Sequence, residues 1–273
     1  MASASNISVI IPLYNKASEI ELTLRSVLIQ SLPPREIIVV DDGSTDRSAE
    51  IVESIGSPLV RLIRQENSGV SAARNRAMRE ATGEWVALLD GDDMWGTDYL
   101  ATVAEMIERW PGCGAYGTAF MIDDGNNCVP ASCCDKMGVV DFFAESMTRY
   151  VLIPSATTLR RDLALELGGF PEGMRMGEDQ FLWTKIARVA DVCFMPKPSA
   201  NSLLGIYLLL ISLRYSASGC IPTSARHSST LSASSNSNGV YVPSSPRCTC
   251  EPYFCGRPSK TATLSSIIAT APA

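Results

Sequence analysis

Paired carboxylates follow two apolar runs of strand character in this chain of 273 residues. The run "IIVV" ends in Asp41 and Asp42, and the run "VALL" ends in the motif "DGDD" at residues 90–93. With Asp46 this makes six nearby carboxylates, which repel one another unless a cation joins them. Mg²⁺ and Mn²⁺ favour oxygen ligands, and proteins commonly hold Mg²⁺ with one or two carboxylates plus substrate phosphates. The pattern predicts a metal-bridged diphosphate, and turn-forming aspartates are the alternative.

A further acidic pair, Glu178 and Asp179, opens the segment "GEDQFLWTKIA" at residues 177–187, whose apolar spacing is helical. The sequence contains one histidine, His227, so a Ser-His-Asp or Cys-His mechanism has almost no histidine available as its base. Any acid–base chemistry is therefore expected to come from carboxylates. The alternative for this pair is that both acids simply favour the positive end of a helix dipole.

Alternating strand and helix patterns position these acids. Apolar runs predict strands at residues 6–15, 35–42, 60–65 and 84–90, and helical spacing predicts helices at 18–30, 44–55, 68–81 and 96–110. Ser68 is the expected cap of the third helix. This order predicts an α/β fold with a mostly parallel sheet and helices on both faces. Ligands bind outside the carboxyl ends of such strands, which is where both aspartate motifs fall.

Motifs for several other kinds of site are missing or out of place. The sequence has no G-x-x-x-x-G-K-[ST] phosphate loop. The stretch "GCGAYG" at residues 112–117 follows a helix and runs into a strand, the reverse of a dinucleotide site. Cys248, Cys250 and Cys255 lack zinc-finger spacing. The formal net charge of -6 excludes the basic character of a nucleic-acid-binding protein.

The composition changes near residue 198. Residues 1–197 hold 28 of the 29 Asp and Glu, whereas residues 198–273 hold only Glu251, five Lys and Arg, and 17 Ser. We expect one domain over 1–197 and a low-complexity Ser/Pro/Cys-rich tail over 198–273, either disordered or read from a shifted, non-native frame. No signal peptide and no apolar run of about 20 residues is visible, and nine cysteines are read as reduced thiols. These features predict a cytoplasmic location.

Three stretches carry a family resemblance over roughly residues 6–197. They are "SVIIPLYNKASEIELTLRSVLIQSLPPREIIVVDDGSTDRSAEIV", "RQENSGVSAARNRAMREATGEWVALLDGDDMW" and "GEDQFLWTKIA". Together they closely resemble family-2 glycosyltransferases of the GT-A fold, which is Rossmann-like. The resemblance implies metal-dependent, inverting transfer of a sugar from a nucleotide-diphosphate sugar, with a UDP-sugar favoured. It also implies a saccharide or lipid-linked acceptor, and surface polysaccharide or glycan biosynthesis as the setting.

The resemblance assigns roles to particular positions. The metal, Mn²⁺ or Mg²⁺, is expected on Asp92 with Asp90, and Asp42 is expected to hydrogen-bond the nucleobase. Asp179 of the "ED" pair, beside Glu178, corresponds to the general base. The residues expected to contact the sugar nucleotide are Pro12, Tyr14, Asn15, Glu19, Asp42, Asn67, Gly69, Arg74, Asp90 and Gly91.

The chemistry of an inverting transfer fits these roles. One base must take a proton from the attacking acceptor hydroxyl, and a metal ion on Asp92 would neutralise charge on the departing diphosphate. Two alternatives stay open. A sugar nucleotidyltransferase would need a Gly-rich, basic loop after the first strand, where this chain has "PLYNKAS". A truncated, non-catalytic sugar-nucleotide binder is the other, because the resemblance stops after "CFMPKP" at residues 193–198. At most peripheral contact with the inner membrane face is expected.

Overall fold

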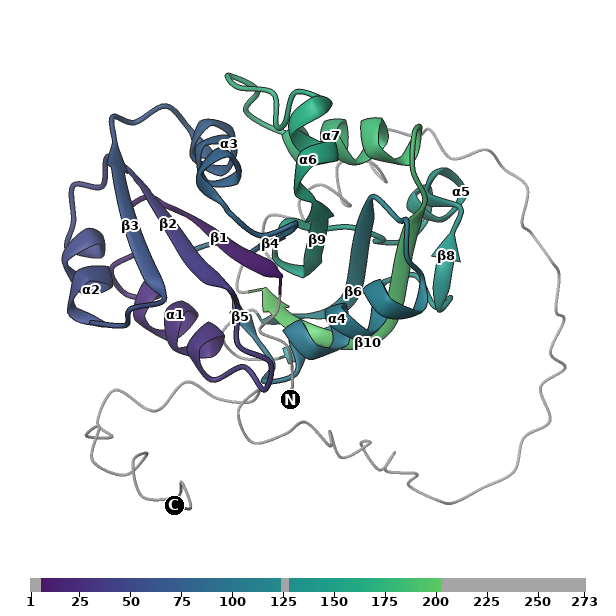
Figure 1. Cartoon of the computed structure of the whole chain (residues 1–273), viewed down its shortest axis with the longest axis horizontal. Coiled ribbons are helices and arrows are strands. Elements are labelled where there is room, and N and C mark those ends of the chain that lie inside the picture. The colour runs from purple at the N-terminus through teal and green to yellow at the C-terminus, as the bar shows by residue number, and fades with distance from the viewer. Residues whose placement is uncertain (1–5, 124–127, 203–273) are drawn as a thin grey trace, which may run out of the picture. The chain divides into compact units, whose positions relative to one another are not determined.

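The described part of the chain is built around a mixed β-sheet (Figure 1). The computed structural model describes residues 6–123 and 128–202, so most of the predicted tail lies outside the described residues. The strands are β1 (Ile7–Leu13), β2 (Glu36–Asp42), β3 (Val60–Gln65), β4 (Trp85–Leu88), β5 (Met94–Trp95), β6 (Ala115–Asp123), β7 (Cys128–Pro130), β8 (Gly138–Val140), β9 (Thr157–Arg160) and β10 (Val192–Ser202). The α-helices are α1 (Ile20–Leu28), α2 (Ser48–Ser54), α3 (Val70–Glu80), α4 (Tyr99–Arg109), α5 (Phe142–Ser146), α6 (Arg161–Glu166) and α7 (Glu178–Ala187).

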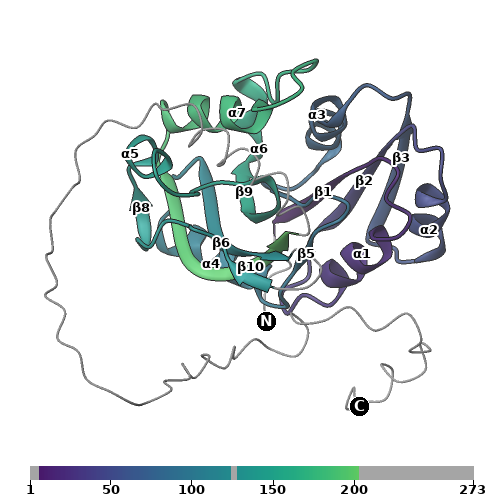
Figure 2. The same ribbon diagram turned by 180° about the vertical axis from the view of Figure 1, so that it is seen from behind.

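The first half of the sheet is parallel, in the order β3-β2-β1-β4. Its central strands are continuous Val and Ile runs that are buried on both faces, as parallel strands between helices are. Helices α1 and α2 cover one face, and α3 crosses back over the other face (Figures 1 and 2). The order in which the chain adds strands to the sheet therefore reverses between β1 and β4, although the strands themselves stay parallel. Such a switch point leaves a crevice at the carboxyl ends of the strands.

The second half of the sheet mixes strand directions. β9 lies between β4 and β6 and is antiparallel to both, whereas β6 and β10 are parallel. The predicted α/β architecture with flanking helices is confirmed, and its parallel pairs are β3-β2-β1-β4 and β6-β10 among the described strands. β10 continues to Ser202, so this strand crosses the boundary that the sequence placed after residue 197.

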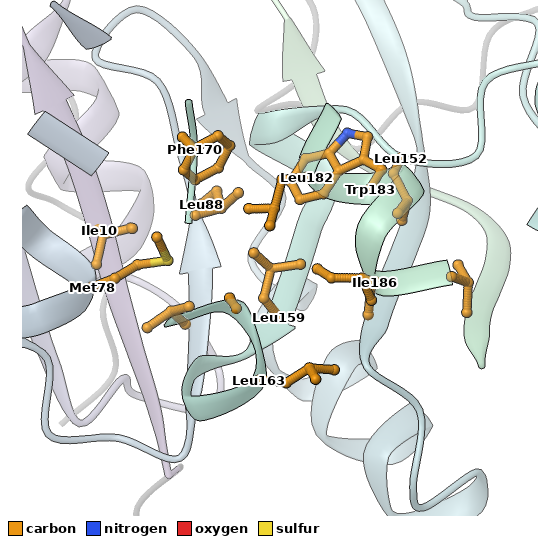
Figure 3. Close-up of a cluster of buried hydrophobic side chains, with 14 of the residues drawn as sticks. Ile10, Met78, Leu88, Leu152, Leu159, Leu163, Phe170, Leu182, Trp183 and Ile186 are labelled. Carbon is orange, nitrogen blue, oxygen red and sulfur yellow. The ribbon is translucent and has the colours of Figure 1, made fainter. Parts of the chain in front are cut away.

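A hydrophobic cluster fastens α7 to the sheet and to α3 (Figure 3). Leu182, Trp183 and Ile186 of α7 are all fully buried in it. The Trp183 ring meets Phe170 edge to face, with ring centroids 5.8 Å apart. Burial of each such side chain contributes roughly 1.5–3 kcal/mol, so the cluster fixes the position of the first turn of α7.

Helix α3 begins one residue later than the sequence indicated. Its N-cap is Gly69, with a φ of 89°, and not Ser68. The prediction for Ser68 is wrong because its hydroxyl donates to the Glu66 carbonyl oxygen, while its backbone N–H donates to Asp42. The left-handed backbone at position 69 favours glycine.

Candidate active site

A pocket of about 360 Å³ opens at the carboxyl ends of β1, β2 and β4. Its volume lies within the range of small-molecule sites. The lining residues are Pro12, Leu13, Tyr14, Lys16, Asp42, Asn67, Gly69, Val70, Ala73, Arg74, Asp90, Gly91 and Asp92. The structure therefore brings most of the predicted donor-binding residues to one crevice, at the switch point of the sheet. Lys16, Val70 and Ala73 were not predicted from the sequence.

Asp42 is held by donors from the segment that joins β3 to α3. Its Oδ1 accepts from the Gln65 side chain at 2.7 Å and from the Ser68 N–H at 2.9 Å, and its Oδ2 accepts from the Gly69 N–H at 2.8 Å. The aspartate thus fixes the wall of the pocket that carries Asn67 and Gly69. Three hydrogen bonds leave a carboxylate with lone pairs to spare, so a further donor can still bind.

Asn15 and Glu19 are not among the residues that line the pocket. Asn15 has a φ of 52°, its side-chain oxygen accepts from the Thr45 N–H at 2.8 Å, and its own N–H donates to the Ser44 hydroxyl at 3.0 Å. It therefore ties the loop after β1 to the loop after β2. Glu19 is the N-cap residue of α1 and adds negative charge near Lys16.

Arg74 is a buried cation that joins the pocket to helix α7. Its Nη2 donates to Asp90 at 2.7 Å, and its Nη1 donates to Glu178 at 3.1 Å. Its guanidinium lies 5.2 Å from the centroid of the Phe170 ring. Only 4% of the Arg74 side chain is exposed, and the two carboxylates outweigh the effect of burial, so the pKa of Arg74 is raised. Arg74 therefore stays charged and ties Asp90 to Glu178.

Lys16 supplies the second cation of the pocket. Its Nζ donates to Asp92 Oδ2 at 2.6 Å. Burial alone would lower the pKa of Lys16, but the hydrogen bond and charge of Asp92 outweigh it and raise that pKa. Lys16 could not be assigned to the site from the sequence, because a lone lysine three positions after a strand gives no signal of where its ammonium group lies.

Other predicted carboxylates serve local turns. Asp41 accepts from the Ser44 N–H at 3.2 Å, and Asp46 accepts from the Ala17 N–H at 3.1 Å and the Ser48 N–H at 2.9 Å. The expectation that all six aspartates crowd one another needs correction, because Arg74, Lys16 and backbone N–H groups partner most of them.

Asp179 lies in the first turn of α7 and is partly buried. It is not among the lining residues of the pocket, but Arg74, which is, contacts the neighbouring Glu178. Burial, followed by the nearby charge of Glu178, raises the pKa of Asp179. A carboxylate with a raised pKa is a stronger base, which suits proton abstraction.

Asn75 fixes the segment that leads to α7. Its side chain donates to the Phe170 carbonyl oxygen and accepts from the Phe170 N–H, each at 2.8 Å. Gly169 must be a glycine here, because a Cβ at that position would lie 2.4 Å from the Asn75 side-chain oxygen. Two adjacent residues of α3, Arg74 and Asn75, therefore position the acidic pair relative to the pocket.

Hydrogen bonds through Ser155 hold the loop that carries Asp90 and Asp92 in place. The Trp95 indole N–H donates to the Ser155 carbonyl oxygen at 2.7 Å, and the Ser155 hydroxyl accepts from the Asp90 N–H at 3.1 Å. The Trp95 ring stacks on Tyr99, with centroids 4.0 Å apart. Trp95 is buried, so its role here is packing and support of this loop.

The donor set of the pocket fits a hard divalent ion. Among the described residues there is no group of three or more His, Cys, Asp or Glu placed to hold a metal. Asp90 and Asp92 nevertheless both line the pocket. Two carboxylates with room beside them match the usual magnesium arrangement, in which substrate phosphates complete the coordination.

The chain belongs to glycosyl transferase family 2, whose family model matches residues 8–168. The Bacillus subtilis protein TuaG, whose name describes a teichuronic acid biosynthesis glycosyltransferase, is 43% identical to this chain over 123 residues. The matched part is 44% of this chain and 49% of TuaG, so the chain spans about half the length of this relative.

Two solved structures share the fold. The structure of S. aureus TarS 1–349 in complex with UDP-GlcNAc matches with a TM-score of 0.65 and 28% sequence identity, covering 72% of this chain and 58% of that one. The mannosyltransferase PcManGT from Pyrobaculum calidifontis, in complex with GDP-Man and Mn²⁺, matches with a TM-score of 0.59 and 26% identity, covering 77% and 61%. The GT-A fold expected from the sequence is confirmed.

Proposed function

We propose that this chain transfers a sugar from a nucleotide-diphosphate sugar to an acceptor hydroxyl, with inversion at the anomeric carbon. The observation that carries the proposal is the placement of Asp90 and Asp92 at the switch-point pocket, linked through Arg74 to the acidic pair that opens α7. Family membership supports the reaction class, and the bound UDP-GlcNAc and GDP-Man of the two structural neighbours support the donor class.

Asp179 is the proposed general base. It would accept the proton of the acceptor hydroxyl while that oxygen attacks the anomeric carbon from the side opposite the diphosphate. Attack and departure then occur in one displacement, and no covalent intermediate on the protein is needed. Glu178 holds its partner Arg74 in place and, by its charge, keeps Asp179 basic.

The donor would lie along the carboxyl ends of β1, β2 and β4. Asp42, with Asn67 and Gly69 beside it, is proposed to bind the nucleobase end, and the loop from Pro12 to Tyr14 is proposed to cradle the nucleotide. Asp92 and Asp90 would hold Mn²⁺ or Mg²⁺, which when bound supplies positive charge for the leaving diphosphate. A UDP-sugar is favoured as donor.

The proposed acceptor is a saccharide or a lipid-linked saccharide of a surface polysaccharide. The relation to TuaG, named for teichuronic acid biosynthesis, supports this setting. No helix in the described ranges is long and apolar enough to cross a membrane. A cytoplasmic place of action, at the inner membrane face, is part of the proposal.

Slow hydrolysis of sugar nucleotides tests the proposal without a known acceptor, since water can replace the hydroxyl. The protein is incubated with Mn²⁺ and UDP-GlcNAc, UDP-glucose or GDP-mannose, and the released sugar is followed by proton NMR. We expect release of the nucleoside diphosphate together with a sugar whose anomeric configuration is first opposite to that of the donor. Retained configuration would refute inversion. Binding without release would favour a non-catalytic sugar-nucleotide binder.

A further inference from the structure

The ion pair between Lys16 and Asp92 occupies the carboxylate on which the metal is expected. The ammonium group lies 2.6 Å from Asp92 Oδ2. Asp92 itself is largely buried, with 8% of its side chain exposed, so few other directions are open to a second cation. A divalent ion on the same carboxylate would lie close to the ammonium group, and the two cations would repel each other, so Lys16 in this position disfavours metal binding to Asp92.

Lys16 is built to leave this position without unfolding the site. Its backbone N–H donates to the Ser48 hydroxyl at 2.8 Å, and its carbonyl oxygen accepts from the Ile20 N–H at 2.9 Å, so the main chain is anchored. The side chain is 36% exposed, and a lysine stem carries its charge on four flexible carbons. The ammonium group can therefore swing within the pocket while α1 stays in place.

We propose that Lys16 is a positioning residue that makes divalent-metal binding depend on the nucleotide. Without a nucleotide, its ammonium group neutralises Asp92 and disfavours a divalent ion there. When a nucleoside diphosphate enters, its phosphate oxygens offer the ammonium group a new partner and free Asp92 for the metal. Metal and diphosphate then bind cooperatively, and the coupling is reciprocal. This inference rests on the proposed donor site.

The test measures Mn²⁺ binding by the loss of the free-ion signal in electron paramagnetic resonance, with and without saturating UDP, and with GDP in a parallel series. The proteins are the wild type, Lys16→Gln and Arg25→Gln. Arg25 pairs with Glu21 on the exposed side of α1, the helix that follows Lys16, so its replacement removes one positive charge away from the pocket lining. Lys16→Met serves as a second neutral variant, and Lys16→Arg keeps the cation.

We expect wild type, Arg25→Gln and Lys16→Arg to bind Mn²⁺ weakly alone and at least about tenfold more tightly with the nucleotide. Lys16→Gln and Lys16→Met should bind Mn²⁺ about tenfold more tightly than the wild type without nucleotide, and their coupling should shrink by about the same factor, leaving the part that the phosphate ligands supply. Unchanged coupling between Mn²⁺ and nucleotide in both neutral variants, or loss of that coupling in Lys16→Arg, would overturn the proposed role of Lys16. It would leave the proposed function intact. No Mn²⁺ binding by the wild type with either nucleotide would overturn the metal site of the proposed function as well.

Discussion

Arg74 on α3 donates a hydrogen bond to Glu178 at the start of α7 over 3.1 Å, although 104 positions separate the two residues in the chain. The same guanidinium group donates to Asp90 at the pocket. One buried cation thus sets the distance between the proposed metal-binding loop and the helix that carries the proposed base. The arrangement joins two halves of the site that lie far apart in the sequence.

Arg74→Gln should strongly destabilise the fold. Removing one partner of a buried ion pair costs about 3–5 kcal/mol, because the carboxylates that remain lose their counter-ion in a poorly solvated place. Urea denaturation of the two proteins measures the difference. Arg61→Gln is the matched control: its partner Glu80 lies 2.8 Å away, but the two side chains are 44% and 42% exposed. That substitution should cost less than about 1 kcal/mol. Equal losses in the two variants would contradict the structural role of Arg74.

Asp179→Asn should abolish most of the turnover and leave nucleotide binding unchanged. Loss of a general base typically lowers kcat by roughly 10²–10⁴-fold. In the wild type, the rate should fall as the pH drops through the raised pKa of Asp179, so the acid limb should lie above the ordinary value of 3.8. Steady-state kinetics against pH tests this, with Asp162→Asn on the exposed side of α6 as the control. An acid limb at or below the ordinary value would argue against Asp179.

The same substitution should stabilise the protein near neutral pH. Since burial raises the pKa of Asp179, the folded protein binds more protons than the unfolded chain between 3.8 and the raised pKa. Stability contributed by this group therefore falls as the pH rises through that window. Asparagine avoids the burial of a charge, so Asp179→Asn should have the higher free energy of unfolding at pH 7. The gain should vanish under acidic conditions, and a gain that persists there would refute the linkage.

Gly169→Ala should disturb the link between α3 and α7. The new methyl group would lie 2.4 Å from the Asn75 side-chain oxygen, at a residue with a φ of 65°. Gly173 is a matched control because its φ is 80° and a Cβ added there would meet no heavy atom within 4 Å. Gly173→Ala should cost about 1–2 kcal/mol from backbone strain, and Gly169→Ala about 1–3 kcal/mol more from overlap. Thermal unfolding compares them, and equal costs would show that Asn75 yields without penalty.

Much of the fold follows from the sequence, because continuous Val and Ile runs and helical spacing are strong local signals. The runs that end at Asp42 and near Asp90 predicted the central parallel strands and the edge where the site lies. β9 was not predicted, since four residues are too few to show a period, and it is antiparallel to both of its neighbours in the sheet. The short strands β7 and β8 escaped prediction for the same reason.

The candidate site was predicted less completely than the fold. Acidic residue types at strand ends marked Asp90 and Asp92, but side-chain direction is a tertiary property. The sequence marked Arg74 as a donor contact and the structure places it in the pocket lining, but its ion pairs with Asp90 and Glu178 could not be predicted. For the same reason Lys16 could not be assigned to the site, and Asn15 proved not to be among the residues that line the pocket.

The most direct test of the account is a thermal-shift measurement with UDP, GDP and dTDP, each with and without Mn²⁺. Ligands that bind only the folded state stabilise it, by about 2.7 kcal/mol at a hundredfold excess over Kd. We predict a rise in Tm of roughly 5–10 °C with one nucleotide, dependent on Mn²⁺, absent in Asp92→Asn and retained in Asp162→Asn. A folded protein whose Tm does not change with any nucleotide, or a shift that survives in Asp92→Asn, would contradict a metal-assisted sugar-nucleotide site.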